Sequence, residues 1–469
     1  MKKSIVARGI SLLLVFVLSL GALSGCGKKA SDKDDEGRTV ISVGSWPPKE
    51  SEALTAMNER KDRFEKANPD VKIEPDNWAF ERQTFYAKAA GGQLPTVYMA
   101  GFTEVPEIIN SEYAADLSKV LKKRGYDGMF NKNIMDIISS DGRIMAFPTT
   151  AYILGLAYNV DMFEAAGLMN SDGTPKQPKD WNEVIDFAVK IKKATGKPGF
   201  VLPTTSNSGG WIFTPIAWSF GVEFMKKDKS GKWKATFDTP EAAEALQFVK
   251  DLKWKYDVLP SNTLINGEDW YKSFAVGEGG MTITAGDYTR RVVKYEMKPE
   301  QVGIMAMPSG PKRHVTLLGG DVLCVRNDAT DDQIDAAIRW IETKNSYKLT
   351  DEYKTNVKNS IATKLSEGQH VGIKSMSPWS TSAEAVAWEY DYIDKNTNAN
   401  PNHVKLYNDF VANCTADIQP EEPVCCQELY AILDGCIQEV LSNKNADCAK
   451  LMKKANKDFQ ANYLDNLTY

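Results

Sequence analysis

The sequence lacks the motifs that mark most enzymes and metal proteins. Only three of its 469 residues are histidine. Gly-x-Ser-x-Gly, His-Glu-x-x-His and Gly-x-x-x-x-Gly-Lys-Ser/Thr are all absent, so serine-hydrolase, zinc-protease and P-loop signatures are missing. No Cys-x-x-Cys pair occurs either, and a zinc site is therefore not expected. The chain offers no recognisable catalytic, cofactor or metal centre.

Basic charge is also scarce. Lys and Arg total 57 against 62 Asp and Glu, the net charge is −5, and no block of basic residues occurs. Binding to phosphate backbones needs clustered Lys and Arg, so nucleic acid is not an expected partner. With 42% hydrophobic residues the composition is that of an ordinary globular protein, and the length suggests two or three domains.

The one strongly apolar run lies at the N-terminus and is short for a membrane span. Three basic residues precede the apolar residues 10–20, and Leu-Ser-Gly-Cys follows at 23–26. This layout predicts a signal peptide over 1–25. Its end resembles a bacterial lipobox, which implies that Cys26 carries lipid (palmitate among its chains) and that 26–38 forms a polar tether. A simple cleaved signal is the alternative.

Cysteine is concentrated at the other end of the chain. Cys324 lies in an apolar run, which predicts a buried free thiol. Five further cysteines fall in the last 60 residues: Cys414, Cys425, Cys426, Cys436 and Cys448. An extracytoplasmic location permits disulfides, but sequence cannot assign pairs, so disulfides and reduced thiols both stay open.

Short β-rich runs alternate with amphipathic helices along the chain. Strands are expected at 40–43, 71–73 and 96–100, with helices between them. This spacing is typical of parallel α/β units. A second α/β region follows Pro148, and Asp180 has the position of an N-cap for its first long helix. After the apolar run around Cys324 the chain becomes largely helical.

Several segments resemble one known family. They carry the letters FEKANPDV (64–71), LPTVYMA (94–100), DGRIMAFP (141–148), LAYN (156–159), MFEAAGL (162–168), PKDW (178–181) and MPSGP (307–311), in this order. Their order and spacing resemble those of the extracellular solute-binding lipoproteins of bacterial ABC importers. The carbohydrate-type group that includes maltose-binding protein is the closest in pattern.

The resemblance implies an α/β fold of the periplasmic-binding-protein type, class II, with a ligand cleft between two lobes and a helical C-terminal part. Lobe one is then expected over 39–149 plus 303–328. Lobe two is expected over 150–302 plus 329–469. The crossings would lie near residues 149, 303 and 327, and closure of the lobes on ligand is the expected motion.

Eleven tryptophans is a high count, and several lie in expected loops. Sugar sites combine flat aromatic rings with carboxylates and amides. On this basis, and from the family's pattern, the candidate ligand-binding residues are Trp46, Glu81, Tyr152, Trp211, Trp270, Asp287, Tyr288, Gly320, Asp321 and Trp379. Three tryptophans on helix stripes are expected in the core: Trp181, Trp254 and Trp340. Trp218 and Trp388 stay undecided.

The resemblance implies a binding protein that is not an enzyme. It would capture a sugar or oligosaccharide outside the cytoplasm and deliver it to membrane permease subunits served by a cytoplasmic ATPase. We expect a monomer, anchored to the cell membrane through Cys26 and without a cofactor. A polyamine or a sugar phosphate is the alternative ligand. A secreted glycoside hydrolase is the alternative function, although no carboxylate pair stands in a recognisable catalytic setting.

Overall fold

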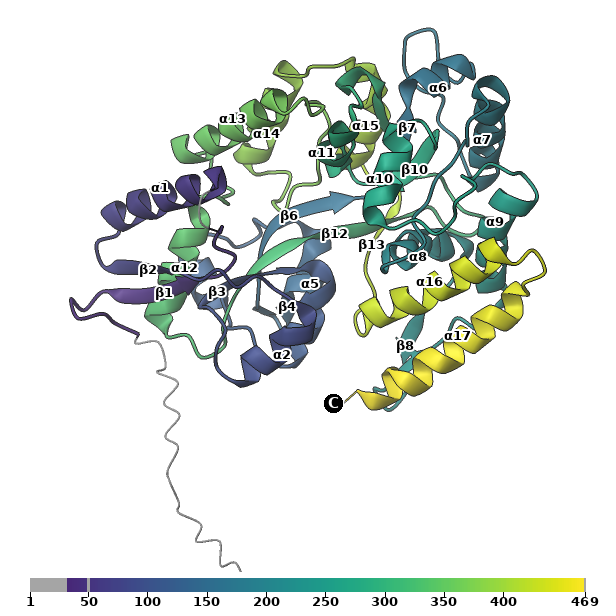
Figure 1. The fold of residues 1–469 in the computed structure, drawn as a ribbon. Helices are drawn as coiled ribbons and strands as arrows, with labels where there is room; N and C mark the ends of the chain where they lie inside the picture. The colour runs from purple at the N-terminus through teal and green to yellow at the C-terminus, as the bar shows by residue number, and fades with distance from the viewer. Residues whose placement is uncertain (1–31, 49–50, 468–469) are drawn as a thin grey trace, which may run out of the picture.

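The structure is a computed structural model that describes residues 32–48 and 51–467 (Figure 1). The expected signal peptide, Cys26 and the first part of the tether lie outside these residues. The described chain forms two α/β lobes joined by strands that run from one lobe to the other.

The first lobe is built on a mainly parallel sheet. β1 pairs in parallel with β2 on one side and β3 on the other, as the alternation of strands and helices predicted. The alternate residues Ile41 and Val43 of β1, and Val71 and Ile73 of β2, are buried, which fixes the register of the pair. The strands are β1 (Thr39–Val43), β2 (Val71–Pro75) and β3 (Val97–Gly101).

Helices cover this sheet. α1 begins after Ser51, whose hydroxyl accepts a hydrogen bond from the Leu54 amide, a standard N-cap. The helices before the first crossing are α1 (Glu52–Ala67), α2 (Arg82–Ala90), α3 (Val105–Asn110), α4 (Ser118–Lys123) and α5 (Lys132–Ile138). A 3₁₀ turn, η1 (Phe102–Glu104), connects β3 to α3, and the hairpin of β4 (Ser139–Ser140) and β5 (Arg143–Ile144) follows α5.

Three strands run along the boundary between the lobes. β6 (Phe147–Ile153) pairs antiparallel with the long strand β12 (Val315–Val325). The far end of β12 pairs with β3 of the first lobe, and its beginning pairs with β13 (Asp417–Pro420). One continuous ladder therefore links the lobes, and bending of these strands is the simplest route to a change in lobe angle.

The second lobe has a smaller antiparallel sheet. β7 (Gly155–Asn159) lies in its centre and pairs with β10 (Met281–Thr284) and β11 (Val302–Met305). All five residues of β7 are buried, as expected of a central strand covered on both faces. β7 follows β6 directly, so the first crossing strand leads straight into this sheet.

Helices make up most of the second lobe. The expected N-cap Asp180 is confirmed, because its carboxylate accepts hydrogen bonds from the Asn182 and Glu183 amides. Its helices include α6 (Val160–Ala165), α7 (Trp181–Thr195), α8 (Ser208–Phe220), α9 (Pro240–Trp254), α10 (Gly267–Ala275), α15 (Lys405–Ala412), α16 (Cys426–Ser442) and α17 (Cys448–Asn462). α8, α9, α16 and α17 pack against one another.

Apart from the helix at 331–342, the remaining elements are short turns, one hairpin and three further helices. The hairpin consists of β8 (Met225–Lys227) and β9 (Trp233–Ala235). The helices are α11 (Thr289–Val292), α13 (Asp351–Ser366) and α14 (Glu384–Lys395). The 3₁₀ turns are η2 (Gly286–Tyr288), η3 (Val293–Tyr295), η4 (Pro299–Gln301), η5 (Pro401–His403) and η6 (Leu464–Asn466).

The structure corrects the expected lobe boundaries in two places. β11 lies in the sheet of the second lobe, so residues 303–305 do not belong to lobe one. The helix α12 (Asp331–Glu342), expected in lobe two, packs on β1 of the first lobe. Its Gln333 side chain donates to the Val40 carbonyl oxygen at 2.8 Å.

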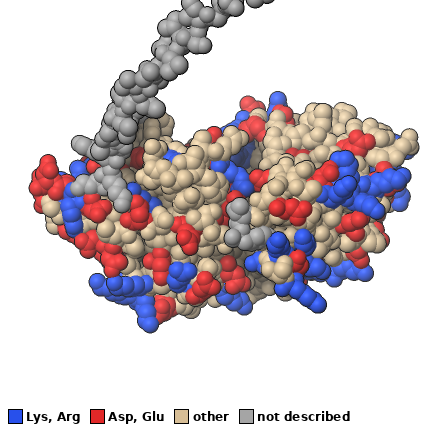
Figure 2. All heavy atoms as spheres, turned by 90° about the horizontal axis from the view of Figure 1, so that it is seen from below, with Lys and Arg blue, Asp and Glu red and all other residues tan. Residues whose placement is uncertain are grey.

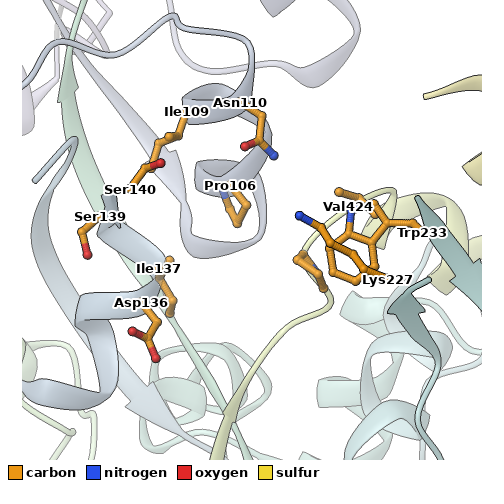
Figure 3. A pocket seen from close by; sticks show the side chains of 11 residues that line it. Pro106, Ile109, Asn110, Asp136, Ile137, Ser139, Ser140, Lys227, Trp233 and Val424 are labelled. Atoms are coloured by element: carbon orange, nitrogen blue, oxygen red, sulfur yellow. The ribbon is translucent and has the colours of Figure 1, made fainter. Parts of the chain in front are cut away.

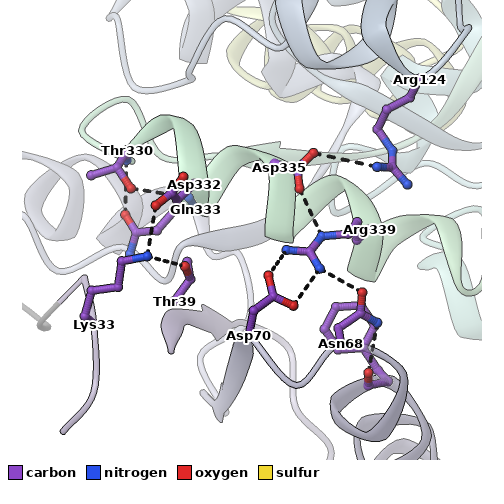
Figure 4. A network of polar contacts seen from close by, with 11 residues as sticks. Lys33, Thr39, Asn68, Asp70, Arg124, Thr330, Asp332, Gln333, Asp335 and Arg339 are labelled. Carbon is purple, nitrogen blue, oxygen red and sulfur yellow. Dashed lines mark hydrogen bonds and ion pairs between the residues drawn. The ribbon is translucent and has the colours of Figure 1, made fainter. Parts of the chain in front are cut away.

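A polar network fixes α12 in this position (Figure 4). Arg339 of α12 forms an ion pair with Asp70, which precedes β2, at 2.7 Å, and Arg124 forms one with Asp335 at 3.6 Å. α12 packs on the first lobe because of the direction in which β12 runs. This strand ends beside β3, so the helix that follows it starts at the first lobe. The chain is back in the second lobe before β13, because η5 and α15 already pack on β11.

Charges of both signs are interspersed over the face of the molecule seen in Figure 2. Of the helices within the described residues, none combines the length and apolarity needed to cross a bilayer. The six cysteines from Cys324 to Cys448 are free thiols, and Cys324 is buried as predicted. In the described part of the chain, His, Cys, Asp and Glu form no group that could hold a metal ion.

Candidate functional site

The crossing strands pack closely because two glycines lie on β12. A Cβ atom on Gly319 would stand 2.3 Å from the Tyr152 ring, and one on Gly320 would stand 2.3 Å from the Thr150 carbonyl oxygen. The Phe102 ring also fills the space beside Gly320, at 2.8 Å from such an atom. Gly320 is buried by protein atoms, so its role here is close strand packing, not the backbone contact with ligand that the sequence suggested.

Tyr152 lies at the centre of the lobe boundary. Burial and the negative charges of Glu421, Asp287 and Asp321 raise the pKa of its hydroxyl, and Tyr271 adds to the effect. We name Tyr152, Asp287, Asp321 and Glu421 the Tyr152 cluster. Its members come from β6, from η2 of the second lobe, from β12 and from the segment between β13 and α16. The cluster therefore draws on both lobes and on the crossing strands.

Hydroxyl groups hold two of the three carboxylates. The Thr150 hydroxyl donates to Asp321 Oδ2 at 2.9 Å. Glu421 accepts hydrogen bonds from the Thr103 hydroxyl of η1 and from the Tyr430 hydroxyl of α16, the latter at 2.8 Å. Glu421 thus connects the first lobe to the second, because Thr103 and Tyr430 lie on opposite sides of the boundary.

The third carboxylate, Asp287, pairs with Arg290 at 3.3 Å, and both side chains are more than half exposed. Desolvation by the surrounding protein raises the pKa of Asp287, while Arg290 and Arg291 lower it. Burial likewise raises the pKa of Glu421, against the two hydroxyl donors. The desolvated Glu421 carboxylate therefore depends on its hydrogen-bond donors, whereas Asp287 remains largely in contact with water.

A second polar group adjoins the cluster. Arg82, the first residue of α2, contacts Glu104 of η1, Glu107 of α3 at 3.0 Å and Glu428 of α16 at 3.3 Å. Burial raises the pKa of Glu104, and Arg82 opposes this effect. We name these four residues the Arg82 cluster. Its Arg82–Glu428 ion pair joins the first lobe to the second.

Trp211 lies half-buried in the first turn of α8, close to the same part of α16. The Asp434 carboxylate of α16 accepts hydrogen bonds from the Asn207 and Gly210 amides, both at 2.7 Å, and so caps α8. The Asn207 side chain also donates to Gln427 Oε1 at 2.9 Å. These contacts hold the beginning of α8 against α16, and the position of Trp211 remains compatible with ligand contact.

Two of the expected ligand-contact residues belong to the core of lobe one. Trp46 is 5% exposed and stacks on Trp340 with ring centroids 6.1 Å apart. Trp379 is 3% exposed and stacks on Phe130 at 5.5 Å. Neither ring presents a free face, so the expectation that they stack on ligand is corrected by this packing.

Two further candidates are buried in lobe two. Trp270 is 2% exposed and donates to the Thr282 hydroxyl at 2.6 Å. Tyr288 is fully buried and donates to the Gly303 carbonyl oxygen at 2.9 Å. Both polar atoms are satisfied by protein groups. The sequence could not distinguish these rings from accessible ones, because each lies beside a polar residue in a short element.

The remaining tryptophans differ in how deeply they are buried. Trp181 and Trp340 are buried as expected, and Trp218, left undecided, is fully buried. Trp388 is half-buried and stacks on Tyr392 at 5.3 Å. Trp254 is half-buried, and its indole donates to the Val440 carbonyl oxygen at 2.8 Å.

Glu81 is exposed at the N-cap of α2 and bonds to the Thr84 hydroxyl at 3.1 Å. It is adjacent in sequence to Arg82, but within the described residues its hydrogen bonds stay inside the first turn of α2. Four residues that meet at the boundary were not predicted from the sequence: Thr103, Glu104, Glu421 and Glu428. The local sequence carries no signal for Glu421, because its partners Thr103 and Tyr430 come from other elements.

A cavity of about 200 Å³ opens elsewhere between the lobes (Figure 3). Pro106, Ile109 and Ile137 line it from the first lobe, while Lys227 and Trp233 face them from the hairpin of the second. Sites for small ligands are commonly larger, about 300–1,000 Å³. No member of the Tyr152 cluster lines this cavity, so we treat it as separate from the candidate site.

Comparison with known proteins gives consistent results. The sequence model described as bacterial extracellular solute-binding protein matches residues 47–344. The chain is 26% identical over 307 residues to the putative ABC transporter periplasmic-binding protein YcjN of Escherichia coli (strain K12), covering 63% of this chain and 65% of that protein.

Solved structures extend the likeness to nearly the whole chain. Maltose-bound MalE3 of T. maritima superposes with a TM-score of 0.64 at 23% identity, covering 90% of this chain and 99% of that one. UgpB from Mycobacterium tuberculosis, in complex with glycerophosphocholine, gives a TM-score of 0.65 at 17% identity, with 90% and 98% covered. At these identities the likeness establishes the two-lobe α/β fold, as the sequence predicted.

Proposed function

The chain belongs to the bacterial extracellular solute-binding protein family, and from this premise we propose that it captures a sugar or oligosaccharide at the Tyr152 cluster, between its lobes. Members of this family are receptors for transport and not enzymes, so the hydrolase alternative falls away. The chain acts outside the cytoplasm as the solute-binding protein of an ABC transporter.

The observation that carries the proposal is the composition of the Tyr152 cluster. Tyr152 and Asp321 lie on the paired crossing strands β6 and β12, and Glu421 accepts hydrogen bonds from Thr103 of the first lobe and Tyr430 of the second. Carboxylates accept hydrogen bonds from sugar hydroxyls, and a flat ring packs against the apolar face of a pyranose. Trp211 and Glu81 are candidates for the outer part of the same site.

A sugar phosphate suits the boundary less well. Arg82 is surrounded by three carboxylates and Arg290 is paired with Asp287, so neither guanidinium is free for a phosphate. The excess of acidic side chains would also repel an anion. The glycerophosphocholine bound by the UgpB structure shows only that this fold accommodates phosphodiesters in another protein.

Delivery requires a partner at the membrane. We propose that the closed form docks on a permease pair driven by a cytoplasmic ATPase, and that lipid on Cys26 keeps the monomeric protein at the cell surface. A Cys26→Ala variant should move the protein from the membrane fraction to the soluble fraction. If the variant is retained on the membrane as fully as the wild type, the lipid anchor is excluded.

The proposed function is tested by thermal unfolding of the purified protein against neutral saccharides, sugar phosphates and polyamines. A solute present at 100 times its Kd adds about 2.7 kcal/mol to the free energy of unfolding. The proposal expects a clear rise in Tm with a saccharide. A rise only with phosphates would retain the binding role and replace the ligand class, and the absence of any rise would overturn the binding site.

A further inference from the structure

The cavity between the lobes contains polar groups that the rest of the described chain does not use. The Asn110 amide of α3 and the Asp136 carboxylate of α5 line it from the first lobe (Figure 3). Within the described residues, neither side chain forms a hydrogen bond or an ion pair. On the facing wall, the Lys227 ammonium lies 5.2 Å from the centre of the Trp233 ring. The cavity therefore combines an unbonded carboxylate and an unbonded amide with an indole ring.

Both walls of the cavity include regular secondary structure. Asn110 and Asp136 lie on helices, while Lys227 and Trp233 lie on the two strands of the β8–β9 hairpin. The Ala235 amide at the end of β9 donates to a side-chain oxygen of α17 at 2.8 Å, and α17 packs on α9 and α16. Groups on helices and strands are held more precisely than groups on loops. A molecule that contacts both walls would therefore link the two lobes in one defined position.

The chemistry of the lining favours a neutral sugar ring. Asp136 and Lys227 supply one charge of each sign, so a net charge on the bound molecule brings no advantage. Sugar hydroxyls donate to a carboxylate and accept from an amide, and an indole packs against the apolar face of a pyranose. The volume of about 200 Å³ is small for a complete ligand. One ring of a longer saccharide therefore fits these observations better than a complete ligand does.

The cavity adjoins the sugar site proposed above. Glu421 accepts a hydrogen bond from Thr103, and both residues lie close in sequence to the cavity wall. Pro423 of the wall follows two residues after Glu421, and Pro106 follows about one helical turn after Thr103. No member of the Tyr152 cluster lines the cavity, so a single sugar ring does not fill both places. A saccharide of two or more rings can extend from one to the other.

We propose that the cavity is a second sugar subsite, in which one ring of an oligosaccharide packs on Trp233 and hydrogen-bonds to Asn110 and Asp136. This inference rests on the proposed function, since it gives the sugar captured at the lobe boundary a length of two or more rings. It assigns a ligand contact to the β8–β9 hairpin, which carries none of the ligand-binding residues predicted from the sequence. A monosaccharide is excluded as the preferred solute.

The test compares saccharides that differ in length. Calorimetric titration uses the monomer, dimer and trimer of three series: α-1,4-linked glucose, β-1,4-linked glucose and β-1,4-linked N-acetylglucosamine. In the series that binds, we expect the dimer or the trimer to bind at least about tenfold more tightly than the monomer. Equal affinity of monomer, dimer and trimer would overturn the inference.

Variants of the cavity wall locate the effect. Trp233→Ala should weaken the trimer at least about tenfold, because it removes the ring on which the second sugar packs. Asp136→Ala should weaken it about fivefold, because it removes a hydrogen-bond acceptor. The monomer should bind both variants as it binds the wild type. The control is Asp127→Ala, which removes an exposed carboxylate of the first lobe that does not line the cavity.

Tm values without ligand verify that each variant is folded. Asp136 is exposed, so Asp136→Ala tests the cavity by itself if the Trp233 variant does not fold. Unchanged affinity for the trimer in every folded cavity variant overturns the inference. A saccharide that binds with no preference for length also overturns it, while the binding function stands. If no saccharide of any series binds, both the inference and the proposed function are overturned.

Discussion

The α12 interface and the lobe boundary use the same charged residue types in opposite ways. Around α12, Arg339 pairs with Asp70 and Asp335, Lys33 pairs with Asp332, and the network links the helix to its own lobe (Figure 4). At the lobe boundary, Asp321 and Glu421 bond to hydroxyl groups and, within the described residues, form no ion pair with a basic side chain. Paired charges fix a helix in place, whereas unpaired ones leave binding capacity for a solute.

The largest expected effect is on stability and concerns Trp46, which stacks on Trp340 of α12. Trp46→Ala should lower the free energy of unfolding by about 3–5 kcal/mol, because it removes a large buried ring from the core. Solute affinity of the folded fraction should not change. Denaturant unfolding measures the free energy of unfolding, and calorimetric titration measures the solute affinity. A large loss of affinity at unchanged stability would show that Trp46 contacts the solute.

The next effect concerns Glu422, beside the Tyr152 cluster. Burial raises the pKa of this carboxyl to about 7, although the Trp218 indole donates to it at 3.0 Å. A folded-state pKa above the unfolded value of 4.5 means that stability is lost as the pH rises through about 7.

Glu422→Gln should therefore stabilise the protein at pH 8, by up to about 3 kcal/mol from the linkage of the two pKa values. The gain should shrink as the pH falls toward 5. Urea unfolding at pH 5, 6.5 and 8 gives the comparison, with the exposed Glu244→Gln as control. Equal stability of variant and wild type at every pH would show that ionisation of Glu422 does not lower the free energy of unfolding.

A smaller effect is expected on binding alone. Tyr152→Ala should weaken the solute by about 2 kcal/mol, roughly thirtyfold, because the ring is the aromatic surface at the meeting of the lobes. Tyr152→Phe keeps the ring and should lose much less. Calorimetric titration of the wild type and the two variants measures the solute affinity. Equal affinities would show that Tyr152 does not contact the solute.

The smallest effect returns to α12. Arg339→Ala removes the ion pairs with Asp70 and Asp335, and since Asp70 is largely exposed we expect a loss of only about 1 kcal/mol in stability. Affinity should stay within twofold of the wild type. Equilibrium unfolding combined with titration checks both, and an affinity loss as large as that of Tyr152→Ala would erase the distinction between the two regions.

Much of the architecture followed from sequence. Strand–helix alternation and the N-cap at Asp180 gave correct elements because they depend on local chemistry. The direction of β12 could not be foreseen, because the side of the molecule on which α12 begins depends on pairing between β12 and β3, which are more than 200 residues apart. The lobe boundaries were misplaced for this reason.

Site residues were predicted less well. The ligand contacts of Asp287, Asp321 and Tyr152 stay predictions, although the structure does bring Tyr152 and Asp321 together on the paired strands β6 and β12. Trp46 and Trp379 were misplaced, because a tryptophan in a loop has the same local sequence whether its ring is stacked in the core or accessible. Glu421 and Arg82 were not recognised as partners in the boundary, since their neighbours come from distant parts of the chain.

The central claim is that the lobe boundary around Tyr152 binds the solute. Its most direct test is calorimetric titration of the solute that raises the Tm most into the wild type and into the double variant Tyr152→Ala/Glu421→Gln, with both proteins verified as folded. The account predicts that saturable binding seen in the wild type is lost, or weakened at least a hundredfold, in the double variant. Binding of unchanged affinity would contradict it and place the solute elsewhere on the molecule.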